Sequence, residues 1–151
     1  MKLKIGDKAP SFSLNNQNGE TVSLEGLIEN KILVLYFYPK DDTAGCTAEA
    51  CKFRDEYEVF KENGAEVVGI SSDSEESHTS FVKSNNLPFQ LLSDKNGKIR
   101  KKYDVPKTLG IIPGRVTYII NSDSRILHIF NSQFNPQKHI DEAIAIIKSN
   151  N

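Results

Sequence analysis

The 151-residue chain has few cysteines, almost no net charge and no long apolar segment. Its 19 basic and 20 acidic residues leave a net charge of -1, so it has no basic field that would attract a nucleic-acid backbone or an anionic lipid surface. The longest apolar run, residues 32–38, is far shorter than the roughly 20 residues that cross a bilayer. We therefore expect neither a nucleic-acid partner nor a membrane protein.

The N-terminus and the cysteine count bear on the cellular compartment. Residues 1–7 lack the apolar stretch of a signal peptide, which predicts a cytoplasmic protein, or one of an organelle stroma if it is encoded there or has been trimmed. Two cysteines in such a reducing compartment do not favour a structural disulfide, so the pair is catalytic, redox-active or incidental. The cysteines and three dispersed histidines fit no zinc-ligand spacing, and we expect no metal and no cofactor.

Length and composition predict one globular domain over residues 1–151. With 38% apolar and 26% charged residues, the chain lies far from disordered compositions. At this size, folding buries on the order of 70% of the surface that the unfolded chain exposes. A hydrophobic core is therefore expected to hold the fold without disulfides.

The apolar pattern of the first half of the chain alternates between strand and helix. Residues 31–38 form a continuous β-branched and aromatic run that Pro39 stops, which is typical of a central strand buried on both faces. The other elements predicted here are a hairpin over 10–14 and 20–24, a long helix over 46–63, a buried strand over 65–70, and a helix that a Ser72–Glu75 capping box opens and that ends near residue 85.

The second half adds a pair of strands and a closing helix. Only four residues, 121–124, separate the two strands, so they are antiparallel. The predicted elements are a weak strand at 91–92, a short helix over 98–103, strands over 116–120 and 125–130, and an amphipathic helix that begins at Pro136. This order predicts the α/β class: a central mixed β-sheet flanked by helices on both faces, with an N-terminal β-hairpin, as in the thioredoxin-like fold.

The loop over residues 39–46 is the predicted site, because ligands of α/β sheets collect beyond the carboxyl ends of the parallel strands. Cys46 falls in the first turn of the long helix, where unpaired N–H groups and the helix dipole favour a thiolate. The alternative is that Cys46 is a small buried apolar residue. Its neighbours are polar or small and leave both interpretations open: Thr43, Gly45, Thr47 and Glu49.

Residues 36–50, YFYPKDDTAGCTAEA, resemble the active-site signature of peroxiredoxins, Pro-x-x-x-Thr-x-x-Cys. The segment is most similar to the bacterioferritin comigratory protein, or Q-type, subfamily, and the resemblance extends over nearly the whole chain. It implies a thiol-dependent peroxidase, often monomeric, that reduces hydrogen peroxide and organic hydroperoxides and draws electrons from thioredoxin or a similar dithiol reductant. The other segments that resemble family positions are 6–12, 77–78, 91–94 and 114–118.

The resemblance also implies roles for five residues. Cys46 matches the peroxidatic cysteine, which peroxide oxidises to a sulfenic acid, and Cys51 matches the resolving cysteine, which closes an intramolecular disulfide. Thr43 and Pro39 match residues that shape the pocket of the peroxidatic cysteine. Arg115 matches the active-site arginine.

Chemistry explains why such a site needs these residue types. Lowering a free thiol's pKa from about 8.5 to about 6 raises its thiolate fraction roughly thirtyfold at most at neutral pH, and its nucleophilicity falls at the same time. The larger contribution must come from fixed donors that stabilise the negative charge growing on the leaving oxygen. The expected donors are the Arg115 guanidinium, the Thr43 hydroxyl and the backbone N–H groups of Gly45 and Cys46.

The spacing of the two cysteines constrains any disulfide between them. In a helix an i to i+5 pair has its Cα atoms about 8.6 Å apart, whereas a disulfide needs about 7 Å or less. A Cys46–Cys51 bond therefore requires the start of the helix to unwind. Ala44 stands where the most similar relatives usually carry proline, which removes a rigid residue from this loop.

Several of these residues have simpler alternative roles. Thr43 could be a turn or N-cap hydroxyl, and Glu49 either orients an arginine or is an exposed acid in the first helical turn. Cys51 could be a buried helix residue of a one-cysteine enzyme. His78 is interpreted as a surface helix residue. Arg115 could be a surface cation, as could Arg54, Arg100 and Arg125.

Two other functional classes compete with the peroxidase interpretation. A thiol–disulfide oxidoreductase typically uses Cys-x-x-Cys, whereas the spacing here is Cys-x-x-x-x-Cys, which disfavours it. A non-catalytic binding or chaperone-like module on the same fold is the third possibility. Prompt loss of both thiols in one chain on treatment with peroxide distinguishes the peroxidase from the other two.

Overall fold

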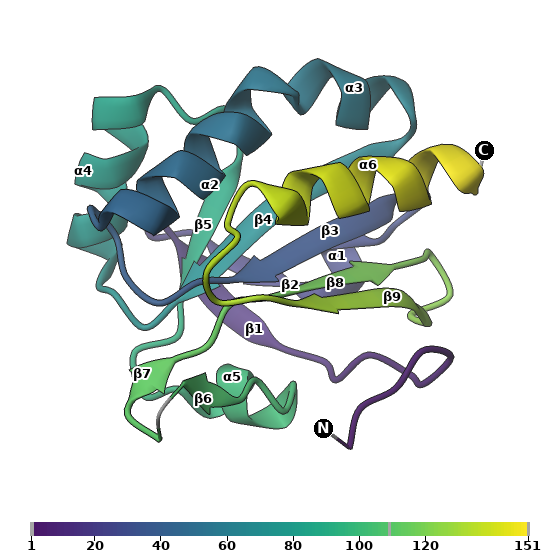
Figure 1. The fold of residues 1–151 in the computed structure, drawn as a ribbon, viewed down its shortest axis with the longest axis horizontal. Coiled ribbons are helices and arrows are strands. Elements are labelled where there is room, and N and C mark those ends of the chain that lie inside the picture. Colours follow the sequence, from purple (N-terminus) through teal and green to yellow (C-terminus); the bar gives the residue numbers. More distant parts are fainter. Residues whose placement is uncertain (1, 109, 151) are drawn as a thin grey trace.

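The computed structural model describes residues 2–108 and 110–150, and its centre is a seven-stranded mixed sheet (Figure 1). The strands of this sheet are β1 Ser13–Asn16, β2 Thr21–Ser23, β3 Ile32–Phe37, β4 Ala65–Ser71, β5 Gln90–Ser93, β8 Val116–Ile120 and β9 Ile126–Asn131. They lie in the order β2-β1-β5-β4-β3-β8-β9. The central trio β3, β4 and β5 is parallel, and the other pairs are antiparallel. A separate small pair joins β6 Lys107–Thr108 to β7 Ile112–Pro113.

Helices cover both faces of the sheet, as predicted. The helices are α1 Leu24–Leu27, α2 Ala44–Asp55, α3 Tyr57–Glu62, α4 Glu75–Asn85, α5 Lys98–Lys102 and α6 Lys138–Ser149. Apolar side chains of α2, α3, α4 and α6 pack on one face, and those of α1 and α5 pack on the other (Figure 1). Across the described part of the chain, no helix has both the length and the apolar character that a membrane span requires.

Strand β3 is buried on both faces, which confirms the interpretation of its sequence. Leu33, Leu35 and Phe37 belong to the core beneath α1 and α5. Val34 and Tyr36 belong to the core beneath α2, α4 and α6. Because β3 pairs with β4 on one side and β8 on the other, its carboxyl end lies at the middle of the sheet. The loop that follows β3 therefore begins among well-packed elements.

The prediction of one long helix over 46–63 is wrong in two respects, its start and its continuity. It begins two residues earlier, at Ala44, and it is broken at Glu56, whose φ of -101° and ψ of 7° lie outside the helical range. Beyond the break, the Tyr57 hydroxyl donates to Glu66 of β4 at 2.7 Å, and the Tyr57 ring contacts Phe89. These contacts with other parts of the chain favour the separate helix α3, and a local periodicity cannot reveal them.

The start of α4 also corrects the sequence interpretation. The N-cap is Ser74, whose hydroxyl oxygen accepts the Ser77 N–H at 3.1 Å, and not Ser72 as the capping-box pattern suggests. The N-terminal hairpin is confirmed, with Leu14 opposite Val22 in its register. The short elements α1, β6 and β7 were not predicted, because segments of two to four residues carry no measurable periodicity.

Gly69 of β4 provides a test of this packing. A Cβ atom at Gly69 would lie 2.8 Å from Cζ of Tyr36 and 2.9 Å from Cδ2 of Leu91, so a side chain does not fit. We expect Gly69→Ala to lower the free energy of unfolding by about 1–3 kcal/mol in urea denaturation, as overpacking of a core does. Gly64→Asn is the control, because nothing lies within 4 Å of a Cβ there and asparagine tolerates its φ of +72°. Equal destabilisation by the two variants would contradict the packing argument.

Candidate active site

The first turn of α2 holds the thiol predicted to react. The chain leaves β3 through residues 38–43 and enters α2 at Ala44, and the Thr47 N–H donates to the Thr43 carbonyl at 2.9 Å. The N–H groups before Thr47 have no acceptor inside the helix, as at any helix N-terminus. Cys46 lies in this turn with a free thiol and is 1% exposed, and no acidic side chain occupies the first turn of α2. The positive end of the helix dipole is therefore not offset at the sulfur.

Arg115 places a second positive charge at the sulfur. Its Nη2 lies 3.5 Å from Sγ of Cys46, although the two residues are 69 positions apart. Its Nη1 donates to Oε1 of Glu49 at 2.5 Å, and its Nε donates to the Gln133 carbonyl at 3.2 Å. The side chain is 4% exposed, so Arg115 is not a surface cation. The structure thus brings together the two residues on which the predicted chemistry most depends.

Gly45 makes room for this guanidinium. A Cβ atom at Gly45 would lie 3.1 Å from Nη2 of Arg115, which is tighter than ordinary van der Waals contact. From the sequence, Gly45 is expected only to provide a backbone N–H donor, so this steric role is additional. Only a glycine next to the cysteine pointed to such a close approach.

Glu49 orients the arginine, which was one of the two alternatives for this residue. It is completely buried one turn after Cys46 and forms an ion pair with Arg115. Burial raises the pKa of Glu49, and the Arg115 guanidinium opposes this rise; the contact at 2.5 Å favours the ionised form of both partners. Burial lowers the pKa of Arg115, but Glu49 and Cys46 more than offset this effect, so the net shift is upward and the guanidinium stays charged.

His139 was not predicted as part of the site, and the structure places it behind Glu49. Its Nε2 donates to the Ser132 carbonyl at 2.8 Å, which leaves Nδ1 to accept the Thr117 hydroxyl at 2.8 Å. The same Nδ1 lies 3.8 Å from Oε2 of Glu49, an oxygen with no hydrogen-bond partner among the described residues. Burial lowers the pKa of His139 to about 4, so the ring is neutral near pH 7. A histidine in a polar stretch of sequence gave no signal of this contact.

Thr43 and Pro39 lie on the approach to α2. Thr43 occupies the N-cap position without a side-chain cap bond, and its exposed hydroxyl donates to the Lys40 carbonyl at 2.8 Å. Pro39 is half-buried directly after β3. Two of the predicted side-chain donors therefore differ in their contacts. The Arg115 guanidinium contacts the Cys46 sulfur, whereas the Thr43 hydroxyl donates to a carbonyl of its own turn.

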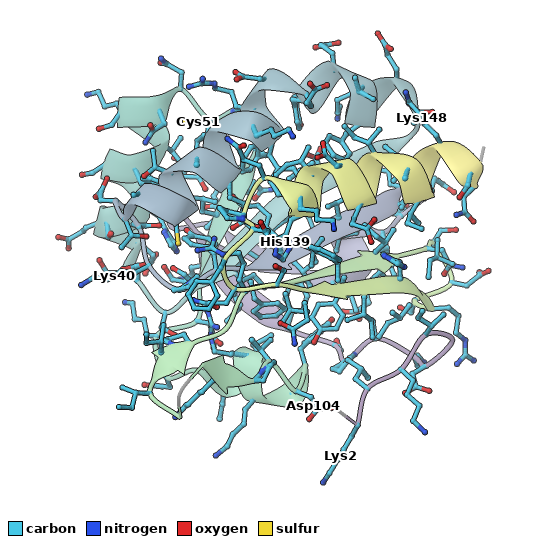
Figure 2. All side chains as sticks on the ribbon, in the orientation of Figure 1. Lys2, Lys40, Cys51, Asp104, His139 and Lys148 are labelled. Atoms are coloured by element: carbon cyan, nitrogen blue, oxygen red, sulfur yellow. The ribbon has the colours of Figure 1, made fainter. Side chains whose placement is uncertain are left out.

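Cys51 lies farther along the same helix, on a wound segment. Figure 2 labels it on α2, where it is half-buried. Its thiol contacts Oδ1 of Asn85 in α4 at 3.6 Å. Both cysteines are free, and α2 is continuous between them. The helix separates the Cα atoms of an i to i+5 pair by about 8.6 Å, so this form of the protein cannot contain the internal disulfide.

His78 is not a surface residue as the sequence analysis suggested. It is completely buried, its Nδ1 lies 2.7 Å from Oδ2 of Asp41, and its Nε2 lies 3.1 Å from the Leu92 carbonyl. Asp41 also accepts hydrogen bonds from the hydroxyls of Tyr38 and Ser77. The periodicity of α4 could not show that the loop carboxylate of Asp41 would lie against this helix.

This histidine is one of three residues whose ligand atoms lie within 4.8 Å of one another: Asp41, Asp73 and His78. Oδ2 of Asp73 accepts the Asp41 N–H at 2.8 Å and the Ser71 hydroxyl at 2.6 Å. Because the protein's own donors satisfy these carboxylates, we interpret the cluster as a structural anchor of the loop before α2.

Arg100 is a further correction, since it was grouped with surface cations. It is 7% exposed, whereas Arg125 is exposed and Arg54 half-buried. Its guanidinium donates to the carbonyls of Tyr38 and Gly114.

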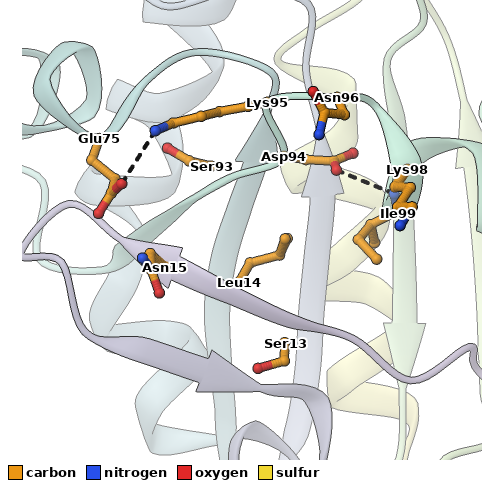
Figure 3. Close-up of a pocket in the computed structure, with 10 residues that line it drawn as sticks. All are labelled: Ser13, Leu14, Asn15, Glu75, Ser93, Asp94, Lys95, Asn96, Lys98 and Ile99. Carbon is orange, nitrogen blue, oxygen red and sulfur yellow. Dashed lines mark hydrogen bonds and ion pairs between the residues drawn. The ribbon is translucent and has the colours of Figure 1, made fainter.

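A pocket of about 350 Å³ lies away from the thiol, between β1 and the loop that leads into α5 (Figure 3). Its lining residues form an ion pair, between Lys95 and Glu75, and a hydrogen bond, from the Ile99 N–H to Asp94. None of the five predicted site residues lines it, so its position gives no reason to move the site. Its lining residues are Ser13, Leu14, Asn15, Glu75, Ser93, Asp94, Lys95, Asn96, Lys98 and Ile99.

Comparison with known proteins gives consistent matches. The sequence matches the AhpC/TSA family over residues 5–129. It is 50% identical over 149 residues to the chloroplastic peroxiredoxin Q of Sedum lineare, covering 98% of this chain and 80% of that protein. The structure is similar to peroxidoxin BcpB of Mycobacterium tuberculosis, with a TM-score of 0.91, 35% identity and 97% of each chain covered. It is also similar to the bacterioferritin comigratory protein of Xanthomonas campestris, described as having alkyl peroxide reduction activity, with a TM-score of 0.85, 28% identity, and 92% and 91% of the two chains covered.

The matched region, residues 5–129, includes the segment around Cys46 and the start of β8 with Arg115. The protein is a thiol-dependent peroxidase on a thioredoxin-like fold. The chain belongs to the AhpC/TSA family and, within it, to the peroxiredoxins of the Q type.

The neutral state of His139 predicts a pH dependence of stability. The folded-state pKa of about 4 lies below the ordinary 6.5, so between these pH values the unfolded chain binds more protons. The stability that the neutral His139 ring contributes is fully present above pH 6.5 and is lost as the pH falls toward 4. We expect wild-type stability to fall more steeply than that of His139→Gln over this interval, by up to about 1.4 kcal/mol per pH unit. Urea denaturation at several pH values measures both slopes, and parallel curves would refute the prediction.

Proposed function

We propose that Cys46 is the peroxidatic cysteine and that it reduces hydroperoxides by direct attack of its thiolate. The sulfur attacks the distal peroxide oxygen, an S–O bond forms and the O–O bond breaks. Sulfur is oxidised to a sulfenic acid, and the leaving oxygen takes up a proton to become water or an alcohol. The observation that carries this proposal is the buried Cys46 sulfur 3.5 Å from Nη2 of Arg115.

Arg115 supports both the attacking and the leaving atoms. A guanidinium at this distance favours the anionic sulfur and can donate to a peroxide oxygen bound beside it. Glu49 and the Gln133 carbonyl hold the guanidinium at two other nitrogens, so little reorganisation is needed when charge develops. The backbone N–H groups of Gly45 and Cys46, in the first turn of α2, are further donors to the leaving oxygen.

The substrates we propose are hydrogen peroxide and organic hydroperoxides. The alkyl peroxide reduction described for the Xanthomonas campestris protein supports the second class. In this proposal Thr43 and Pro39 shape the access to the Cys46 sulfur, since Thr43 carries an exposed hydroxyl at the N-cap of α2 and Pro39 directly follows β3. Pro39 has a fixed φ and no N–H group, so it directs the chain out of β3 without requiring a hydrogen-bond acceptor.

Cys51 resolves the sulfenic acid in our proposal. Its thiolate attacks the Cys46 sulfur, an S–S bond forms, and the sulfenic oxygen leaves as water after taking up a proton. This step requires the first turns of α2 to unwind and the contact between Cys51 and Asn85 to break. Ala44, in place of a more rigid proline at the helix start, favours such unwinding.

A thiol reductant completes the cycle by returning two electrons to the disulfide. We propose thioredoxin or a similar dithiol protein, acting on a monomeric enzyme in the cytoplasm or an organelle stroma. The chloroplastic relatives support the stromal option.

A thiol count after peroxide treatment tests the roles of the two cysteines. With a near-stoichiometric amount of hydrogen peroxide, we expect the wild type to lose both thiols promptly and to gain one internal disulfide, measured by thiol trapping and intact mass. Cys46→Ser should consume no peroxide. Cys51→Ser should still be oxidised at Cys46 but form no internal disulfide.

Any one of three results would overturn this assignment. Peroxide consumption by Cys46→Ser at the wild-type rate would place the reactive group elsewhere. Normal cycling of Cys51→Ser with thioredoxin would show that another thiol resolves the sulfenic acid. Oxidation of the wild type no faster than that of a small free thiol would remove the peroxidase role itself.

Arg115→Ala tests stabilisation of the transition state. We expect the second-order rate constant with hydrogen peroxide to fall by about 100-fold or more, as on removal of a preorganised donor. The loss should persist after correction for the ionised fraction of Cys46, measured by its thiolate absorbance across pH. Arg125→Ala, at an exposed arginine, is the matched control and should react normally. A deficit that the ionised fraction fully explains would limit Arg115 to a ground-state role.

A further inference from the structure

Arg100 reaches the site from the opposite face of the sheet. It belongs to α5, which lies on the face of the sheet away from α2 (Figure 1), and its side chain is buried. Its Nη2 donates to the Tyr38 carbonyl at 2.7 Å, and its Nη1 donates to the Gly114 carbonyl at 3.0 Å. One guanidinium therefore joins two chain segments that are far apart in sequence.

These two carbonyls belong to the residues that precede Pro39 and Arg115. Strands β3 and β8 pair as far as Phe37 and Val116, and beyond that pair the segments diverge. The β3 side continues into the loop that leads to Cys46 in α2, and Arg115 directly precedes β8. Arg100 thus bridges the two segments at the point where the hydrogen-bonded ladder between them ends.

Gly114 shows how closely this edge is packed. A Cβ atom at Gly114 would lie 2.1 Å from the Pro106 carbonyl oxygen, so no other residue fits without moving the backbone. The loop after α5 therefore braces the segment before Arg115 from one side, while Arg100 holds its carbonyl. A shift of the guanidinium of Arg100 would be transmitted directly to the backbone beside Arg115.

Burying the charge of Arg100 costs more free energy than a link that serves the fold alone would need. Within residues 2–108 and 110–150 it forms no ion pair and its Nε has no hydrogen-bond partner, while its Cζ lies 5.9 Å from the centre of the Phe37 ring. Burial lowers the pKa of Arg100, while Asp94 and then Cys46 raise it. A buried cation without a paired carboxylate carries a desolvation penalty, and two carbonyls offset only part of it.

We propose that Arg100 is a positioning residue for the peroxide reaction, which sets the separation of Cys46 and Arg115 by holding the carbonyls of Tyr38 and Gly114. The inference rests on the roles proposed above for Cys46 and Arg115. Arg100 touches neither the sulfur nor the peroxide. It acts through the backbone segments that carry Cys46 and Arg115. A small displacement of these groups is enough to lower the rate of the peroxide reaction strongly.

The surroundings of Arg100 allow a direct test by chemical rescue. Arg100 lines a pocket of about 350 Å³ at this edge of the fold, together with Lys101, Lys107 and Pro113 among others. Because the pocket is open to solvent, the space left by Arg100→Ala is accessible to a guanidinium ion. Guanidinium can donate to both carbonyls at once, as the native side chain does.

We expect Arg100→Ala to lower kcat/KM for hydrogen peroxide about 10- to 100-fold, the size of effect that misplaced reacting groups produce. Guanidinium chloride at millimolar concentrations should restore a substantial part of this rate, and sodium chloride at equal ionic strength should not. Lys101→Ala is the matched control, because Lys101 lines the same pocket but donates to neither carbonyl. Its kcat/KM should equal that of the wild type, with or without guanidinium.

Arg100→Lys keeps the test decisive if Arg100→Ala does not fold. Lysine retains the charge but cannot bridge both carbonyls in the planar geometry of arginine, so its kcat/KM should also fall while circular dichroism stays native. A wild-type rate in either folded variant, or a loss in folded Arg100→Ala that guanidinium does not restore, would overturn the inference. Failure of the proposed function is distinct, because Cys46→Ser would then remain active.

Discussion

The contact between the Arg115 guanidinium and the buried Cys46 sulfur is the interaction on which the rest of the site depends. The two groups come from parts of the chain that are 69 residues apart. The sulfur is fixed by the first turn of α2, and the guanidinium is fixed by Glu49 of that same helix and by the Gln133 carbonyl. Because Glu49 and Cys46 share one helix, the carboxylate that orients the arginine moves with the thiol. Winding of α2 therefore assembles the cation, its carboxylate and the sulfur together.

The architecture explains how so distant a pair meets. The parallel strands β3 and β4 bring the loop before α2 to the carboxyl end of the sheet, and β8 pairs antiparallel with β3, so that its first residue arrives at the same edge. A thiol at a helix N-terminus and an arginine at a strand start are thus placed side by side by the sheet register. The opposite face contributes as well, through Arg100, which in our proposal holds the ends of β3 and β8 together.

The sequence predicted those features that local patterns or a family signature can carry. The continuous apolar run identified β3, and the family resemblance identified the cysteine and arginine that the structure places in contact. What could not be predicted are buried polar residues whose partners lie elsewhere in the chain. His78 and Arg100 have the sequence surroundings of surface residues, yet both are buried. The carboxylate of Asp41 is the partner of His78, and two backbone carbonyls accept hydrogen bonds from Arg100. The break at Glu56 has the same origin, because contacts of Tyr57 with β4 and Phe89 compete with helix continuation.

The anchoring of Asp41 has a further consequence for the proposed cycle. His78, Ser77 and Tyr38 hold its carboxylate, and its N–H is held by Asp73, so this point stays fixed when the start of α2 unwinds. The released chain then begins at Asp42, which already has a φ of 61°, and only a few residues separate it from Cys46. A tether this short confines the oxidised sulfur to a small volume near Cys51. In the proposed cycle, the Cys51 thiol therefore acts at a high effective concentration, which thiols free in solution lack.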